Sequence, residues 1–354
     1  MVDGGTRLLT VGAAGTWQTA DASAPRYDIG EGVALGGLVD GHAHLTSGAI
    51  TDMTEADRRA DVPGRLIRNT TAQLVGGVLV VLDKGTHDET TVDATLSIPP
   101  EERPHAVLAG RFLAGPGGYY PDLAIEVAST GLAAAAADYG PESATWVKVI
   151  GDWPRRGVGA IPSFGESELG RAVAAAHRAG RRIAIHTAAP ETASRAVRAG
   201  VDSIEHGLFL TMDDLVRLGE RRGAWVPTIR AMESLHGALR PDSSGAKLLA
   251  EGLENVRRLL PDAVAAGVVV MGGTDLVLAH GAVADEAVAL VDYGMADLDA
   301  VAALTLAPRT FLGMPAFAVG EAADFIVVDA PTVPALAVPK LVVRCGRVLV
   351  DRRR

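Results

Sequence analysis

Eight short β-branched runs recur at roughly even spacing along the chain, with Gly, Asp or His near the end of most of them. Ala-rich amphipathic stretches, such as residues 166–179 and 247–266, separate the runs. This alternation of short strands with helices predicts a parallel sheet that is covered by helices. The eight runs are residues 35–45, 78–85, 105–113, 145–152, 181–187, 201–207, 224–230 and 267–275.

Two parallel α/β architectures fit such an alternation, and the sequence favours a (β/α)8 TIM barrel over a doubly wound open sheet. No Gly-rich phosphate loop follows the first run. The eight units span about 270 residues, which matches the size of a barrel. We expect the barrel to occupy residues 36–315. Residues 1–35 and 316–354 contain β-like segments with Pro and Gly turns, and we expect these ends to form a small accessory β-sandwich.

The composition excludes several classes of function. The 354 residues include 33 Lys and Arg against 43 Asp and Glu, a formal net charge of −10, so the chain has no electrostatic attraction for nucleic acid. The single cysteine, Cys345, can form neither an internal disulfide nor a thiolate cluster. The sequence resembles neither a signal peptide nor a membrane-spanning helix at its start, so we expect a cytoplasmic protein with a small-molecule substrate and no membrane partner. Self-association into a homo-oligomer is left open.

Several side chains that bind metal ions lie at the ends of the predicted strands. The active site of a barrel forms at the C-terminal ends of its strands. His42 and His44 lie two residues apart at the end of the first run, so their side chains point the same way. His186, His206 and Asp275 lie at or near the ends of the fifth, sixth and eighth runs.

Lys148 lies inside the fourth run between apolar neighbours, where a cationic side chain is costly to bury. A neutral amine at this position can add carbon dioxide, and the resulting carbamate has two oxygens that can bridge two cations. Imidazoles, a carboxylate and a carbamate together suit Zn²⁺, with Mn²⁺, Fe²⁺, Co²⁺ or Ni²⁺ as other candidates. We therefore expect two divalent metal ions that share a water, with Asp275 moving its proton during hydrolysis.

Seven motifs together resemble the amidohydrolase superfamily, in the subgroup that is similar to imidazolonepropionases and to barrel-type Xaa-Pro and Xaa-Arg dipeptidases. Each motif is weak alone, but the motifs follow the family's order along the chain. The sequence departs from many relatives at Ala188, where they have a second histidine. The motifs are GGLVDGHAHL (36–45), WVKVIG (146–151), RRIAIHT (181–187), GVDSIEHG (200–207), WVPT (225–228), GGTD (272–275) and GEAADFIVVDA (320–330).

The resemblance implies a metal-dependent hydrolase that cleaves a C–N bond in an amide, peptide or cyclic amide. A hydroxide would bridge the two metal ions, and Asp275 would pass the water's proton to the leaving group. The ligands that the resemblance implies are His42, His44 and Asp275 for the more buried ion, His186 and His206 for the second, and carboxylated Lys148 between them.

Further side chains lie where a substrate would bind. His280 follows Asp275 by five residues and could bind substrate or hold Asp275 in place. Tyr119 and Tyr120 could donate hydrogen bonds to an oxyanion or simply pack a glycine-rich loop. Arg230, at the end of the seventh run, could bind a substrate carboxylate or form a structural ion pair.

Two interpretations concern neighbouring polar residues. Glu205 precedes His206, so strand alternation predicts that its side chain points outward, toward the helices, as a buried acid with its partners satisfied. His87 ends the second run near the rim, and its role is ambiguous.

Two other functions remain open from the sequence. One is a mononuclear deaminase, or a ring-opening or lactone hydrolase, in which Lys148 is unmodified. The other, from a different class, is a catalytically silent barrel that acts as a binding module. The number of metal ions per chain separates these alternatives.

Overall fold

The eight predicted strands form one barrel in the computed structural model. The structure describes residues 9–20, 23, 27–47, 60–86, 88–155 and 159–353. Ladders run from β4 to β5 to β6, and from β9 through β12, β13 and β14 to β15, all of them parallel. The strands are β4 (Leu38–Ala43), β5 (Val78–Asp83), β6 (His105–Leu108), β9 (Trp146–Ile150), β12 (Arg182–Thr187), β13 (Ser203–His206), β14 (Ala224–Val226) and β15 (Val269–Val270).

Two junctions close the barrel. A parallel bridge between Ala109 and Trp146 joins the β6 side to β9. On the other side, the Gly41 N–H donates to the Gly272 carbonyl at 2.8 Å, so β4 lies against the segment after β15. A Cβ at Gly41 would lie 2.9 Å from that carbonyl oxygen, and one at Gly273 would lie 2.6 Å from His42 Cβ. Glycine is therefore required where these two segments meet.

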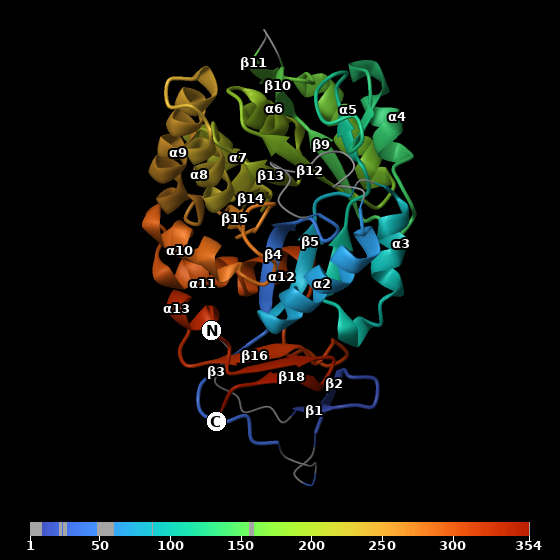
Figure 1. Cartoon of the computed structure of the whole chain (residues 1–354), viewed down its shortest axis with the longest axis vertical. Helices are drawn as coiled ribbons and strands as arrows, with labels where there is room; N and C mark the ends of the chain where they lie inside the picture. Colours follow the sequence, from blue (N-terminus) through green and yellow to red (C-terminus); the bar gives the residue numbers. More distant parts are fainter. Residues whose placement is uncertain are drawn as a thin grey trace.

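Helices cover the outside of the barrel (Figure 1). Two of them, α7 and α9, begin with a side-chain cap. In α7, the Thr211 hydroxyl accepts from the Asp214 N–H while the Asp214 carboxylate accepts from the Thr211 N–H, which is a capping box. The helices around the barrel are α2 (Val62–Val75), α3 (Thr90–Ser97), α4 (Leu132–Ala137), α5 (Glu166–Arg178), α6 (Thr192–Ala199), α7 (Met212–Glu220), α8 (Ile229–Ala238), α9 (Ser244–Ala263), α10 (Ala284–Asp292), α11 (Asp297–Ala303) and α12 (Leu306–Leu312).

Apolar side chains fill one end of the barrel interior. Val39, Val80, Trp146 and Met271 belong to this cluster, and Phe311 of α12 packs against it from outside. A larger apolar cluster lies between the strands and the helices. Because the interior cluster holds the strands rigidly, the polar side chains at the strands' C-terminal ends have a fixed frame.

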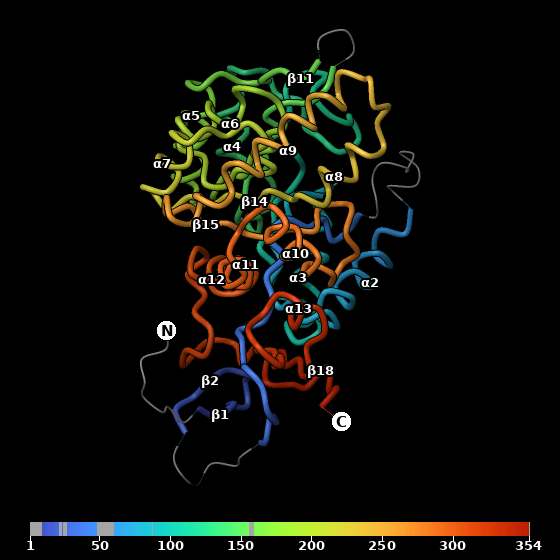
Figure 2. The backbone as a smooth tube through the Cα atoms, turned by 90° about the vertical axis from the view of Figure 1, so that its left-hand side faces the viewer, coloured from blue at the N-terminus to red at the C-terminus, as the bar shows by residue number. Residues whose placement is uncertain are grey.

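A separate sheet packs at one end of the barrel and unites segments that are far apart in the sequence (Figures 1 and 2). Its order is β18–β17–β16–β3, with antiparallel pairing throughout. The hairpin of β1 (Leu9–Val11) and β2 (Trp17–Thr19) faces it across a core that includes Trp17 and Phe325. The accessory sheet predicted from the two ends is thus confirmed. Its strands are β3 (Val33–Leu35), β16 (Phe325–Val328), β17 (Leu341–Arg344) and β18 (Arg347–Asp351), with the short helix α13 (Val333–Leu336) between β16 and β17.

The structure differs from the sequence prediction at four strands, and in the eighth run only Val269–Val270 forms a strand. The third run divides into β6 and β7 (Phe112–Ala114), and β7 pairs with β8 (Ala124–Glu126). The fourth run continues beyond β9 into a hairpin of β10 (Asp152–Arg155) and β11 (Gly159–Pro162). The seventh strand ends at Val226 and α8 begins at Ile229, so the strand is shorter than expected. Among the described residues, no helix combines the length and apolar composition needed to cross a lipid bilayer.

Candidate metal centre

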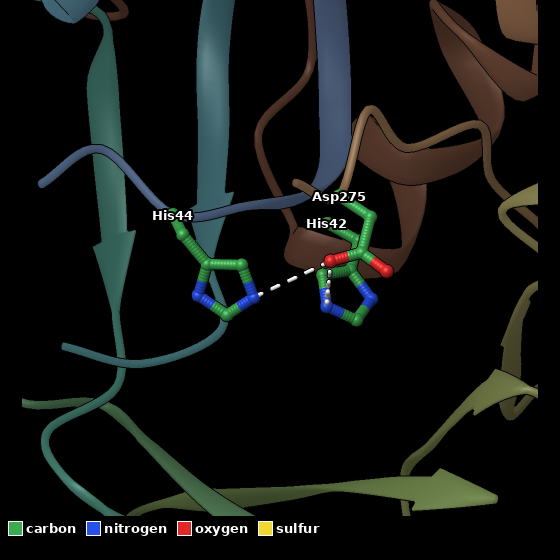
Figure 3. Close-up of side chains that lie close together, drawn as sticks. All are labelled: His42, His44 and Asp275. Carbon is green, nitrogen blue, oxygen red and sulfur yellow. Dashed lines mark ion pairs between the residues drawn. The ribbon is translucent and has the colours of Figure 1, made fainter. Parts of the chain in front are cut away.

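His42, His44 and Asp275 meet at the end of β4 (Figure 3). The Nε2 atoms of His42 and His44 lie 3.7 and 3.6 Å from Asp275 Oδ1. These distances are too long for hydrogen bonds. A tetrahedral ion bound at about 2.1 Å places its ligand atoms about 3.4 Å apart, so the three side chains fit the shell of one metal ion.

Two more histidines continue the cluster. The ring of His206, at the end of β13, lies 5.4 Å from the His42 ring, measured between centroids. The ring of His186, in β12, lies 4.5 Å from the His206 ring. The structure thus brings together the four histidines that the sequence singled out.

Buried acceptors fix the orientation of three of these rings. His42 Nδ1 lies 2.7 Å from Glu205 Oε2, and His44 Nδ1 donates to the Gly85 carbonyl at 2.9 Å. With Nδ1 engaged in this way, Nε2 of both rings is the atom that faces Asp275 with a free lone pair. This is the tautomer in which histidine binds a metal through Nε2.

His206 is held in the same manner by a residue that the sequence prediction missed. Its Nδ1 lies 2.6 Å from Thr228 Oγ1. The Thr228 hydroxyl donates its own proton to the Pro227 carbonyl, so it accepts from His206 Nδ1–H. His186 differs, since its Nε2 lies 3.8 Å from Asp152 Oδ1, beyond hydrogen-bond distance. Asp152 instead accepts from the backbone N–H groups of Ala188 and Ala189.

Burial lowers the pKa of every histidine in the cluster. The pKa falls to about 3 for His44 and His186, and well below its ordinary range for His42 and His206. The charge of Lys148 lowers the pKa of His42 and His186 further. All four imidazoles are therefore neutral at physiological pH, as metal ligands must be.

Lys148 lies in β9 with its side chain inside the barrel and 2% exposed. Its Nζ has no hydrogen-bond partner or ion pair within the described part of the chain. Burial lowers the pKa of Lys148 to about 8, although Glu205 and Asp275 act against the shift. A buried amine without a polar partner is costly unless it is neutral or modified. The chemistry expected for a lysine that becomes a carbamate fits this environment.

Glu205 corrects the prediction from strand alternation. Its carboxylate points into the barrel, where it contacts His42 and lies 3.0 Å from Lys84 Nζ. Glu205 lies on the same face of β13 as Ser203, whose hydroxyl donates to it, and His206 is the residue that departs from alternation, with a left-handed φ of 64°. Burial alone would raise the pKa of Glu205, but Lys84, His42 and Lys148 hold it well below its usual value. Glu205 is thus a charged acid beside the histidine cluster.

Three non-glycine residues around the cluster have left-handed backbones: His206 (φ 64°), Thr228 (φ 46°) and Asp275 (φ 48°). Each lies where a strand ends, and such conformations cost of order 1 kcal/mol or more apiece. Asp40 helps to hold the last of them, because its carboxylate accepts from the N–H and the hydroxyl of Thr274 at 3.0 and 2.7 Å. The candidate site thus holds three of the eight described non-glycine residues with a left-handed backbone.

Asp275 is shielded from solvent, with a side chain 13% exposed. Burial raises its pKa to about 6, against the opposing effect of Lys148. Its backbone N–H donates to the His42 carbonyl at 2.7 Å, so the carboxylate is aimed at the histidines by the β4 junction itself.

His280, in the loop after Asp275, contacts α2 and the segment that follows β4. Its Nδ1 lies 3.2 Å from Gln73 Nε2 in α2, and the ring also hydrogen-bonds to the backbone of Ser47, which follows the first histidine pair. Gln73 Nε2 donates to Asp40 as well, and Gln73 Oε1 accepts from the Gly281 N–H. These contacts join His280 to Gln73 and Ser47, and both roles expected for His280 remain predictions.

Of the remaining substrate-binding candidates, Tyr119 and Tyr120 lie together, and Arg230 is on another element. Tyr119 and Tyr120 pack with Phe112 and Trp153 beside the cluster. Arg230 is in the first turn of α8, where its guanidinium lies 2.9 Å from Glu233 and 3.1 Å from Asp292, and its backbone N–H donates to Glu286. These ion pairs match the structural role weighed for Arg230, while its contact with substrate remains a prediction. His87 lies outside the described residues.

The fold is a barrel of parallel strands with helices outside. A buried cluster of neutral histidines and one carboxylate lies at the C-terminal ends of the strands and defines a candidate metal centre. Comparison with known proteins agrees. Residues 33–347 match the model of the Amidohydrolase family, and the chain belongs to this family. The family is generally metal-dependent, and its members are hydrolases that act on carbon–nitrogen bonds.

Individual relatives extend the comparison. Uncharacterized proteins of Mycobacterium tuberculosis and Mycobacterium bovis are 31% identical over 311 residues, which cover 83% of this chain and 78% of each relative. An amidohydrolase of known structure superposes with a TM-score of 0.78 at 22% identity, covering 96% of this chain and 94% of that one. A Xaa-Pro dipeptidase with methionine bound in its active site gives 0.75 at 23% identity, with 90% and 87% covered. These solved structures share the fold.

Proposed function

We propose that this protein hydrolyses a carbon–nitrogen bond in a small acylated amino acid, dipeptide or cyclic amide, with two divalent metal ions at the histidine cluster. The observation that carries the proposal is the convergence of neutral imidazoles, one carboxylate and an unpartnered buried amine at one end of the barrel. The donor set favours Zn²⁺, with Mn²⁺, Fe²⁺, Co²⁺ or Ni²⁺ as other occupants.

The side chains divide into two sets. His42, His44 and Asp275 would hold one ion, and His186 and His206 would hold the other. Lys148 would connect them after its neutral amine adds carbon dioxide and releases a proton, which yields a carbamate with two oxygen ligands. The lack of any polar partner for Lys148 Nζ supports this assignment.

Divalent ions bound here would lower the pKa of water and polarise the substrate carbonyl. Asp275 would accept the water's proton and pass it to the leaving nitrogen, because its carboxylate lies at the histidine cluster on a fixed backbone. The oxygen of water ends on the carbonyl carbon, the C–N bond breaks, and the transferred proton completes the amine. Burial of His42, His44 and His206 limits the access of bulk water to this transfer.

The substrate class draws support from the comparison with the Xaa-Pro dipeptidase that binds methionine in its active site. An amino acid bound in a site on the same fold is consistent with a substrate of dipeptide size. The strand-end loops of this chain set which substrate of that class is cleaved.

The direct test compares Asp275→Asn with the wild type on a panel of dipeptides, N-acyl amino acids and cyclic amides. We expect Asp275→Asn to lower turnover about 10²- to 10⁴-fold, the range typical of a lost general acid–base group, while it keeps much of its metal. Asp297→Asn, at an exposed position in the first turn of α11, is the matched control. Full activity in Asp275→Asn would overturn the proposal.

The carbamate has a test of its own. Lys148→Ala should lose metal and activity, and acetate or propionate should restore part of both by supplying the missing oxygens. Lys84→Ala, at the other lysine buried near the cluster, should show no such rescue because Lys84 is paired with Glu205. Rescue of both variants, or of neither, would contradict the assignment of Lys148.

A further inference from the structure

The rings of Phe112, Tyr119 and Trp153 form an aromatic wall between two histidines of the candidate metal centre. The Phe112 ring lies 5.7 Å from His44 and 5.1 Å from Tyr119, and Tyr119 lies 4.6 Å from Trp153. Trp153 in turn lies 5.5 Å from His186. The wall therefore runs along the candidate metal centre from one set of ligands to the other, where a substrate group next to the scissile bond would lie.

Trp153 shares a strand face with an arginine. Trp153 and Arg155 are two residues apart in β10, so their side chains point to the same side of the β10–β11 hairpin, about 7 Å apart along the strand. Arg155 reaches the loop that carries Tyr119, since a Cβ at Gly115 or Gly118 would lie 3.3 or 2.9 Å from its Nη2. Small residues in this loop leave room for the guanidinium beside the aromatic wall.

The guanidinium of Arg155 uses few of its donors. It donates to Ser163 Oγ at 3.1 Å, and its buried Nε has no partner in the part of the chain that the structure describes. It forms no ion pair with a described carboxylate. Arg230 offers the contrast, because Glu233 and Asp292 already occupy its guanidinium. Of these two arginines near the strand ends, Arg155 is the one with donors to spare.

We infer that Phe112, Tyr119, Trp153 and Arg155 form a specificity subsite for the amine product of the reaction, which is an amino acid with an aromatic or large apolar side chain and a free carboxylate. The inference rests on the proposed function and names its substrate class: an N-acyl or N-aminoacyl derivative of such an amino acid. The rings contact the side chain by stacking, and Arg155 binds the carboxylate through parallel N–H donors.

Binding of the product amino acid tests the subsite without requiring turnover. We expect metal-loaded wild-type protein to bind L-phenylalanine at least about tenfold more tightly than L-alanine or phenethylamine in calorimetry. Phenethylamine has the ring but lacks the carboxylate, whereas L-alanine has the carboxylate but lacks the ring. Absence of L-phenylalanine binding, or equal affinity for the three compounds, would overturn the inference.

Arginine variants identify the carboxylate partner. Arg155→Met should weaken L-phenylalanine binding about 10- to 100-fold, as expected for a lost charged hydrogen-bond donor, and leave phenethylamine binding unchanged. Arg155→Lys should recover only part of the affinity, because lysine lacks the planar fork. Arg217→Met, an exposed change in α7, is the matched control and should bind like the wild type. An unchanged affinity in Arg155→Met would overturn the role of Arg155.

The aromatic wall is tested by Trp153→Ala, with metal content measured in parallel because Trp153 contacts His186. At full metal content, the preference for L-phenylalanine over L-alanine should fall about tenfold, and a preserved preference would contradict the wall's role. Turnover separates the two proposals. Hydrolysis of amides without these preferences refutes the subsite alone, whereas the expected product binding without hydrolysis of any amide refutes the proposed function alone.

Discussion

Two lysines inside the barrel have equal burial and different surroundings. Lys84, directly after β5, is 1% exposed, and Lys148 in β9 is 2% exposed. Lys84 Nζ lies 3.0 Å from the Glu205 carboxylate and 4.3 Å from the centre of the Trp146 ring. Nζ of both lysines lacks a hydrogen bond of good geometry among the described residues, but only Lys84 has an ion pair and a ring contact there.

The difference teaches that burial alone does not indicate the role of a polar group. A buried cation with a carboxylate and an aromatic face is compensated inside the protein, so Lys84 supports the structure. A buried amine without compensation must gain its partner from outside the chain, which is the position of Lys148. The pair therefore provides an internal control for the metal-centre hypothesis.

The largest expected effect is on metal binding. Lys148→Met should weaken binding of divalent metal by more than the roughly 100-fold that a lost outer-shell partner can cost, and should abolish turnover. Lys84→Met should keep most of its metal when folded. Competition against a chromophoric chelator measures both affinities. If Lys148→Met binds metal as tightly as the wild type, Lys148 does not take part in metal binding and the proposed difference between the two lysines is wrong.

The loss of folding stability should be larger for Lys84→Met than for Lys148→Met, the reverse of the order for metal affinity. Lys84→Met leaves Glu205 buried without its cation, so we expect the free energy of unfolding to fall by about 3–5 kcal/mol. Lys148→Met removes an uncompensated amine and should leave the metal-free protein at least as stable as the wild type. Urea denaturation of the metal-free proteins measures both. A larger loss in Lys148→Met would refute the interpretation of the two sites.

A pH series sharpens the comparison. Burial lowers the pKa of Lys148 in the folded, metal-free state to about 8 from 10.5, so folding carries a cost that is complete below pH 8 and absent above pH 10.5. The cost is about 3 kcal/mol at about 1.4 kcal/mol per pH unit. Wild-type stability relative to Lys148→Met should therefore rise between these pH values. A constant difference across the window would show that Lys148 titrates normally.

The smallest expected effect concerns a hydrogen bond behind a ligand. Thr228→Val keeps the side-chain shape but removes the acceptor for His206 Nδ1–H, so metal affinity should fall about 10- to 100-fold. Thr71→Val, on the exposed face of α2, is the control and should bind metal normally. If Thr228→Val binds metal as the control does, Thr228 does not position His206.

Much of the fold follows from the sequence because strand–helix alternation and the position of active sites in barrels are strong rules. The convergence of His42, His44, His186 and His206 with Asp275 follows from those rules. The inward direction of Glu205 does not, because His206 joins the cluster through a left-handed backbone, a conformation that alternation cannot reveal.

Other features depend on contacts that are distant in the sequence. The pairing of Lys84 with Glu205 joins the residue that follows β5 to a residue of β13, and no local pattern indicates it. Arg230 was expected at a strand end, but the strand stops earlier and the residue lies in the first turn of α8. The environment of Arg155 depends on a hairpin that extends beyond the predicted fourth strand.

The central claim is that this barrel holds two divalent metal ions at the histidine cluster. Elemental analysis of protein purified without chelator and then supplied with Zn²⁺ tests it most directly, with Lys148→Met measured in parallel. We predict two tightly bound ions per wild-type chain and fewer in Lys148→Met. One ion or none in the wild type, or an unchanged count in the variant, would contradict the binuclear assignment.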